Sequence, residues 1–124
     1  MNEYTYQQKI AMMHILLDII QADGIIDERE TFFFNKLKDD FHLTDEDYDN
    51  VKSKNSLLAL TQIKLLSDEQ KKHFAQLMAQ MITIDDDINV NEVAIFNIVS
   101  EVCAINKNLE DAISAEEISH CTKS

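Results

Sequence analysis

Two short acidic segments hold the side chains in this sequence that are best suited to bind a metal ion. The first, Ala22–Glu30, reads ADGIIDERE and follows a long apolar run. It contains Gly24, the one glycine in a chain of 124 residues that has no proline. The second, Ile84–Glu92, reads IDDDINVNE and contains three consecutive aspartates. Carboxylate oxygens at this density suit a hard cation such as Ca²⁺ or Mg²⁺.

We predict a divalent-cation site at one or both of these turns. Three adjacent carboxylates repel one another, and a bound cation relieves that repulsion. Asp18 interrupts an apolar helix shortly before Asp23, and we expect its side chain to project toward the same turn. Ca²⁺ or Mg²⁺ is favoured over Mn²⁺ or Zn²⁺, because neither turn contains the histidine or thiolate of a closed structural zinc site. The predicted metal ligands are Asp18, Asp23, Asp27, Glu30, Asp85, Asp86, Asp87 and Glu92.

An alternative interpretation is that the same residues cap the starts of helices. Asp23 followed by Gly24 is a turn dipeptide, because glycine tolerates a positive φ without steric cost. Asp27 with Glu30 has the spacing of a capping box, and a helix N-terminus favours nearby carboxylates through its dipole. Asn89 with Glu92 repeats that spacing at the second turn. This interpretation leaves the three consecutive aspartates unexplained.

The first turn also has the spacing of the second half of an EF-hand loop. Gly24 would stand at loop position six and Glu30 at position twelve. Positions one and three would then be Ile19 and Gln21, where the loop requires acidic or amide ligands. The second turn lacks ligands at the same two positions, so we reject a true EF-hand.

Helices must position these turns. A chain with one glycine and no proline has almost no residues that break helices, and no segment is typical of a strand. Apolar periodicity predicts an all-α bundle of about seven helices. The predicted helices are Thr5–Ala22, Glu28–Asp40, Thr44–Ser53 with Thr44 as its N-cap, Ser56–Leu66, one that begins at the capping box Ser67–Gln70 and extends through Ile82, one through Val93–Cys103, and Leu109–Ile118.

An internal repeat relates the two turns at an offset of 62 residues, the difference between Asp23 and Asp85. The repeated unit is an apolar helix, an acidic turn and an amphipathic helix, at about 10–44 and again at about 72–106. The identical pairs are Ile20 and Ile82, Asp23 and Asp85, Ile26 and Ile88, Glu30 and Glu92, Phe34 and Phe96, and Asn35 and Asn97. We therefore expect a pseudo-twofold axis that brings both turns to one face.

Charge and composition limit the classes of partner. The chain has 23 acidic against 11 basic residues, a net charge of −12. Such a surface repels phosphate backbones and anionic lipids, so we expect neither nucleic-acid nor membrane binding, and it attracts cations and basic protein partners. A chain that is 45% hydrophobic fits one domain over residues 1–124, with a polar tail at 119–124.

The ends of the chain and its cysteines favour a cytoplasmic protein. Residues 1–8 lack the basic-then-apolar order of a signal peptide, and no apolar run is long enough to span a membrane. Cys103 lies in an apolar helical run and is expected to be a buried thiol, whereas Cys121 lies in the polar tail. The two do not resemble a disulfide framework. We expect a monomer or a weak dimer.

Enzymatic activity is not expected. His14 and Asp18 lie one helical turn apart, a spacing that can ligate a metal or relay a proton, but we favour a partly buried histidine bonded to a neighbour. The sequence has no His-Glu-x-x-His, no phosphate-binding glycine loop and no cysteine pair at metal spacing. A Ser/His/Asp constellation stays open, although nothing points to one. Carboxylates on a solvated turn rarely have the raised pKa that acid–base catalysis needs.

The first turn and its degenerate repeat resemble the TerB-like tellurite-resistance family. The resemblance covers about Ile10 to Ile105 and is most specific in the pattern Ala-Asp-Gly-x-x-Asp-x-x-Glu. It implies an all-helical bundle of about seven helices with internal pseudo-symmetry, a role in stress responses, and divalent-metal binding without enzymatic activity. The matching acids are Asp23, Asp27 and Glu30 in the first motif and Asp85 and Glu92 in the second. The second motif departs from the family pattern at Asp86, in place of glycine, and at Asn89.

Two functional hypotheses follow. In the first, the protein is a TerB-like regulatory module that binds a divalent cation at its acidic turns. In the second, it is an adaptor that docks a basic or helical partner, and the turns are only capped helix starts. Phe32 falls off the apolar stripe of its helix, so it is the aromatic side chain most open to such a partner.

Overall fold

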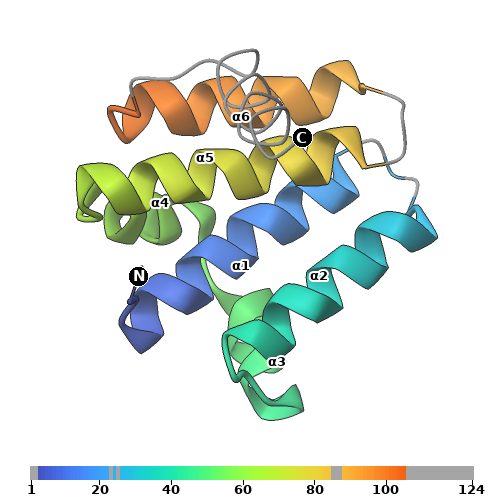
Figure 1. Ribbon diagram of the computed structural model, residues 1–124, viewed down its shortest axis with the longest axis horizontal. Coiled ribbons are helices and arrows are strands. Elements are labelled where there is room, and N and C mark those ends of the chain that lie inside the picture. Colours follow the sequence, from blue (N-terminus) through green and yellow to red (C-terminus); the bar gives the residue numbers. More distant parts are fainter. Residues whose placement is uncertain (1–2, 23, 25, 85–87, 106–124) are drawn as a thin grey trace, which may run out of the picture.

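The computed structural model describes residues 3–22, 24, 26–84 and 88–105, and this part of the chain is all-helical, with six helices and no strand (Figure 1). The predicted all-α class is confirmed. The predicted helix Leu109–Ile118, Cys121 and the polar tail lie outside the described residues. The helices are α1 (Tyr6–Gln21), α2 (Glu28–Asp40), α3 (Asp45–Ser53), α4 (Ser56–Lys64), α5 (Asp68–Thr83) and α6 (Val90–Val102).

Polar side chains cap the starts of the helices, and the predicted caps at Thr44 and Ser67 are confirmed. Thr5, Thr44 and Ser67 are N-caps with complete capping boxes at α1, α3 and α5. Each hydroxyl accepts a backbone N–H that the helix leaves without a partner, which typically stabilises a helix by about 1 kcal/mol. The prediction was wrong at the end of α4. This helix stops at Lys64 instead of Leu66, because Leu65 is its C-cap and its N–H bonds the carbonyls of Gln62 and Ile63.

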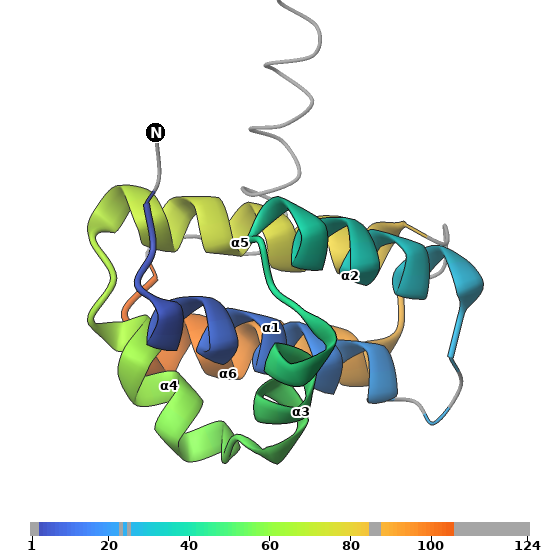
Figure 2. The ribbon, with the colours of Figure 1, turned by 90° about the horizontal axis from the view of Figure 1, so that it is seen from below.

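The core is built around α1. This helix contacts each of the other five, which explains why it is apolar around most of its circumference. In Figure 2, α2 and α5 lie on one side of α1, and α3 and α4 lie on the opposite side. Met12, Met13, Met78 and Met81 are fully buried, and so is Cys103, as predicted. Burial also raises the pKa of the Cys103 thiol.

The two helix pairs that flank the acidic turns have equal lengths. Helices α1 and α5 both contain 16 residues, and α2 and α6 both contain 13. Each second helix begins 62 positions after its counterpart, because Tyr6 corresponds to Asp68 and Glu28 to Val90. The N-caps follow the same offset, with Asp27 at α2 and Asn89 at α6.

Helices α2 and α6 also end alike. The residue after each C-cap has a left-handed backbone, with φ of 59° at His42 and 56° at Ala104. In both cases the next residue is buried, and its N–H bonds back into the helix: Leu43 to the Lys38 carbonyl at 3.0 Å, and Ile105 to the Ser100 carbonyl at 2.8 Å. This is the Schellman arrangement, formed here without the usual glycine.

Candidate functional site

The helices that flank both acidic turns meet at one end of the molecule. Figures 1 and 2 show the end of α1, the start of α2, the end of α5 and the start of α6 together at this end. Gly24 has φ of +76°, the left-handed conformation expected of the turn glycine. Asp23, Asp85, Asp86 and Asp87, four of the predicted metal ligands, lie outside the described residues.

Glu30 and Glu92 are fully buried at this end. Each is the third residue of its helix, α2 or α6, and the exposed fraction of each is 1%. Glu30 stands four and seven positions before the buried Phe34 and Leu37, on the same inward face of α2. Taking a carboxylate out of water costs several kcal/mol unless other groups compensate for its lost hydration, so the fold must supply such groups at both positions.

Asp27 and Asn89 act as helix caps, as the alternative interpretation predicted. Asp27 Oδ1 accepts the backbone N–H of Arg29 at 2.7 Å and its Nε–H at 3.2 Å. The side-chain hydrogen bond from Arg29, followed by the backbone one, holds the pKa of the Asp27 carboxyl below its ordinary value. The carboxylate of Asp27 is therefore ionised at neutral pH, whether or not a cation binds near it.

Asp18 does not project toward the first turn as expected. Its Oδ2 accepts a hydrogen bond from the Ser56 hydroxyl at 2.8 Å and lies 3.5 Å from His14 Nε2. The start of α4 packs against α1 at this point, and the Ser56 hydroxyl there binds the Asp18 carboxylate. A contact between helices, and not the acidic segment, therefore sets the direction of the Asp18 side chain.

His14 is buried and bonded to its neighbours, as favoured from the sequence. Its Nδ1 lies 2.7 Å from the Val51 carbonyl, an acceptor, so Nδ1 donates, and its Nε2 lies 2.9 Å from Ser56 Oγ. Ser56, His14 and Asp18 thus come together, but the carboxylate lies on the Nε2 side with the serine. In a hydrolase triad the carboxylate instead orients Nδ1. The cluster ties α1 to α3 and α4.

The described residues hold no group of three or more His, Cys, Asp and Glu side chains that could bind a metal ion. Asp18, Asp27, Glu30 and Glu92 therefore do not form a site by themselves. A cation at this end of the molecule would need ligands from Asp23 or Asp85–Asp87 as well.

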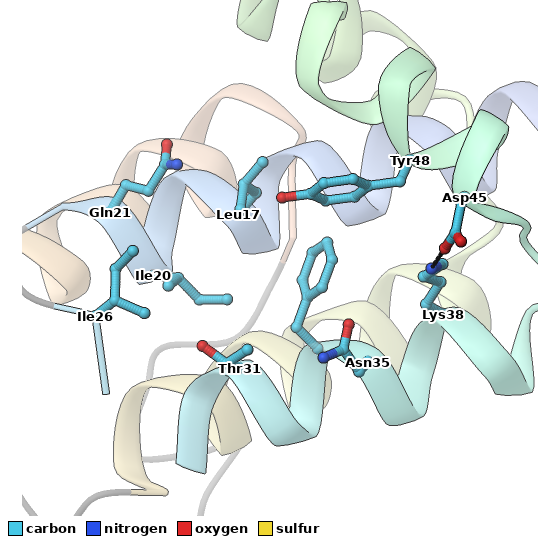
Figure 3. Close-up of a pocket in the computed structure, with 10 residues that line it drawn as sticks. Leu17, Ile20, Gln21, Ile26, Thr31, Asn35, Lys38, Asp45 and Tyr48 are labelled. Atoms are coloured by element: carbon cyan, nitrogen blue, oxygen red, sulfur yellow. Dashed lines mark hydrogen bonds and ion pairs between the residues drawn. The ribbon is translucent and has the colours of Figure 1, made fainter. Parts of the chain in front are cut away.

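A groove that sequence analysis missed lies beside the first turn, between α1, α2 and α3 (Figure 3). It has a volume of about 450 Å³. Three helices contribute to it, so no single segment shows the pattern. The one local signal is the spacing of polar residues along α2, at Thr31, Asn35 and Lys38. Its lining residues are Leu17, Ile20, Gln21, Ile26, Thr31, Phe34, Asn35, Lys38, Asp45 and Tyr48.

The N-terminal segment docks on α5 through a second contact that sequence analysis missed. Tyr4 Oη lies 2.5 Å from His73 Nδ1, and the two rings stack with their centroids 5.8 Å apart. Burial raises the pKa of Tyr4 to about 12 and lowers the pKa of His73. The sequence offered no partner for His73, because Tyr4 lies 69 positions away.

Comparisons with known proteins support the fold alone. No family model matches the chain, and no curated protein matches it. Three solved chains match in structure. One is a protein of unknown function from Porphyromonas gingivalis W83, with a TM-score of 0.71, 21% sequence identity, and coverage of 94% of this chain and 98% of that chain. The chain is thus similar in fold to a protein of unknown function.

Among the described residues, no helix is long and apolar enough to cross a membrane.

Proposed function

We propose that this protein is a non-enzymatic, TerB-like module that binds a divalent cation at one or both acidic turns in a stress-response or signalling context. The observation that carries the proposal is the burial of Glu30 and Glu92 in the first turns of α2 and α6, at the end of the molecule where the helices that flank both acidic segments meet. Ca²⁺ or Mg²⁺ suits these ligands better than Mn²⁺ or Zn²⁺, because hard cations take carboxylate oxygens.

A pseudo-twofold repeat of residues 10–44 and 72–106 belongs to this proposal. The equal helix lengths, the paired N-caps Asp27 and Asn89, and the left-handed residues His42 and Ala104 all follow the same offset and support it. Under such a repeat, Glu30 and Glu92 are equivalent ligands. Each would approach the site from the first turn of its helix, where the helix dipole favours a carboxylate.

The physical case rests on the cost of burying charge. A cation beside a buried carboxylate restores favourable electrostatic interactions that the loss of water removes. The acids of the turns, Asp23, Asp27 and Asp85–Asp87, supply further oxygen ligands that are close in sequence to the two buried glutamates. A cation would also relieve repulsion among the consecutive aspartates.

The test is an NMR titration of the metal-stripped protein with Ca²⁺, Mg²⁺, Mn²⁺ and Zn²⁺ in about 150 mM salt, where diffuse attraction to the surface is largely screened. We expect saturable shifts confined to the two turns and the starts of α2 and α6. Glu30→Gln, Glu92→Gln and Asp27→Asn should weaken binding, and asparagine at position 27 still caps α2. Glu46→Gln, at an exposed acid on α3, is the matched control.

Weak, linear shifts over the whole acidic surface, equal in the wild type and the variants, would contradict the cation site. That result would favour the second candidate function, an adaptor. One observation supports this candidate: α6 exposes the apolar side chains Val90, Ala94, Ile98 and Val102 along one face. The matching face of α2 carries Glu28, Phe32, Lys36 and Asp40, so the helix packing itself does not require an apolar face there.

A further inference from the structure

The groove between α1, α2 and α3 has the construction of a small-molecule site. Its volume of about 450 Å³ falls within the range of about 300–1,000 Å³ that is usual for ligand pockets. Leu17, Ile20 and Phe34 are buried and line it, and the Tyr48 ring packs edge-on against Phe34 at 5.9 Å between centroids. These side chains offer an apolar surface to the body of a ligand.

Polar groups around this apolar surface are available to a ligand. The side chains of Gln21, Asn35 and Tyr48 make no hydrogen bond with any other described residue. Figure 3 shows the Tyr48 hydroxyl directed across the groove toward Leu17. Pockets of this kind typically bind the body of a ligand through apolar contacts and orient it through a few polar groups.

Lys38 places a positive charge at one end of the groove, and Asp45, an exposed residue of the lining, neutralises it. Lys38 Nζ lies 2.6 Å from Asp45 Oδ1 and 5.9 Å from the centroid of the Tyr48 ring. The Lys38 side chain is only 18% exposed, whereas that of Asp45 is 99% exposed. The Lys38 side chain therefore packs within the groove, whereas the side chain of Asp45 is surrounded by solvent apart from its contact with the lysine.

We propose that this groove binds a small amphipathic monocarboxylate. The apolar body of the ligand lies on Leu17, Ile20 and Phe34, and its carboxylate replaces that of Asp45 on the Lys38 ammonium. The exchange substitutes one charge-assisted hydrogen bond for another, and Asp45 loses little by it, because its side chain is already 99% exposed and well hydrated. This proposal is independent of the cation site.

The net negative charge of the protein favours a ligand with one negative charge over a ligand with two. With a formal charge of −12, the rest of the molecule repels every anion, and each further negative charge on a ligand adds to that repulsion. One carboxylate that meets Lys38 directly is compensated locally, whereas a phosphate dianion would carry a second charge without a second cation in the lining.

Decanoate, kept below the concentration at which it forms micelles, is the probe, and its binding is followed by NMR and calorimetry. We expect saturable shifts at the groove residues. Lys38→Met should weaken binding about tenfold or more, the range for loss of a hydrogen bond to a charged group. Asp45→Asn should tighten binding about two- to fivefold, since it removes an exposed competitor for the lysine.

Matched controls separate this mechanism from general apolar adsorption. Lys36→Met and Glu46→Gln change exposed charges on the same two helices away from the groove and should leave the affinity unchanged. Decanol should bind more weakly and should not respond to Asp45→Asn. Thermal melts check that every variant is folded.

Three results would overturn the proposal. One is decanoate binding that Lys38→Met leaves intact. A second is weaker decanoate binding in Asp45→Asn, because the carboxylates would then not compete. The third is saturable binding of decyltrimethylammonium that Asp45→Asn abolishes, since the groove would then select cations. None of these results bears on the metal titration of the acidic turns.

Discussion

At the scale of single residues, tertiary neighbours determine what each titratable side chain can do. Asp18 and Asp27 are both predicted ligands, yet the first bonds Ser56 and the second caps α2. Glu30 and Glu92 lose contact with water altogether. Carboxylates therefore have three physical roles among the described members of one set of predicted metal ligands, and the burial of Glu30 and Glu92 is the observation that carries the proposed function.

His73 should make the stability of the protein depend on pH. Burial lowers its pKa in the folded state below the ordinary value of 6.5. The folded state thus binds fewer protons than the unfolded state, so this contribution to stability is present above about pH 6.5 and is lost as the pH falls through the folded pKa. Urea unfolding at a series of pH values between 5 and 8, at about constant ionic strength, measures it.

His73→Gln should reduce this loss of stability at low pH, because glutamine does not titrate. His42→Asn is the matched control, since His42 is exposed and asparagine tolerates its left-handed backbone. If His73→Gln retains the full pH dependence and His42→Asn removes it, the buried contact with Tyr4 is not the source.

At the scale of helices, the ends show how far local chemistry determines the fold. Hydroxyl caps at Thr44 and Ser67 begin helices as predicted, because the bond to the backbone three residues on needs only local sequence, and Thr5 caps α1 in the same way. The C-terminal ends of α2 and α6 are harder to predict, because neither has the glycine that usually marks a Schellman motif. The buried Leu43 and Ile105 anchor these ends through the core instead.

Ala104→Gly should stabilise the protein. A left-handed residue other than glycine costs about 1–2 kcal/mol, whereas the added chain entropy of glycine in the unfolded state offsets about 0.4–1 kcal/mol of the gain. We expect a net increase of about 0.5–1 kcal/mol in the free energy of unfolding, measured by urea denaturation.

Ala94→Gly is its control, because Ala94 lies within α6 and glycine there should destabilise by about 1 kcal/mol. A loss of stability in Ala104→Gly would show that the left-handed position is not strained.

At the scale of the whole molecule, the central helix α1 and the large negative charge have opposite effects on the stability of the fold. Because α1 contacts each of the other five described helices, the core is continuous and the helices that flank both acidic segments belong to the same packed unit. The net charge of −12 acts against that packing, since acids over the whole surface repel one another in the compact state.

Salt should therefore raise the melting temperature. Increasing NaCl from about 20 to about 200 mM shortens the screening distance from roughly 20 Å to below 10 Å, which weakens repulsion between exposed acids. Asp39→Asn with Asp40→Asn, at exposed positions of α2, should raise the melting temperature in low salt and reduce the response to NaCl. A melting temperature that falls with salt would mean that attractive ion pairs outweigh the repulsion.

The sequence by itself determined the helical class, most helix ends and the central burial of α1. These depend on periodicity and capping, which act within a few residues. The direction of Asp18, the contact between Tyr4 and His73 and the groove around Lys38 depend on segments that are distant in the chain. Only the packing of α3, α4 and α5 against α1 decided them, because helical periodicity specifies which face is buried and not which neighbour covers it.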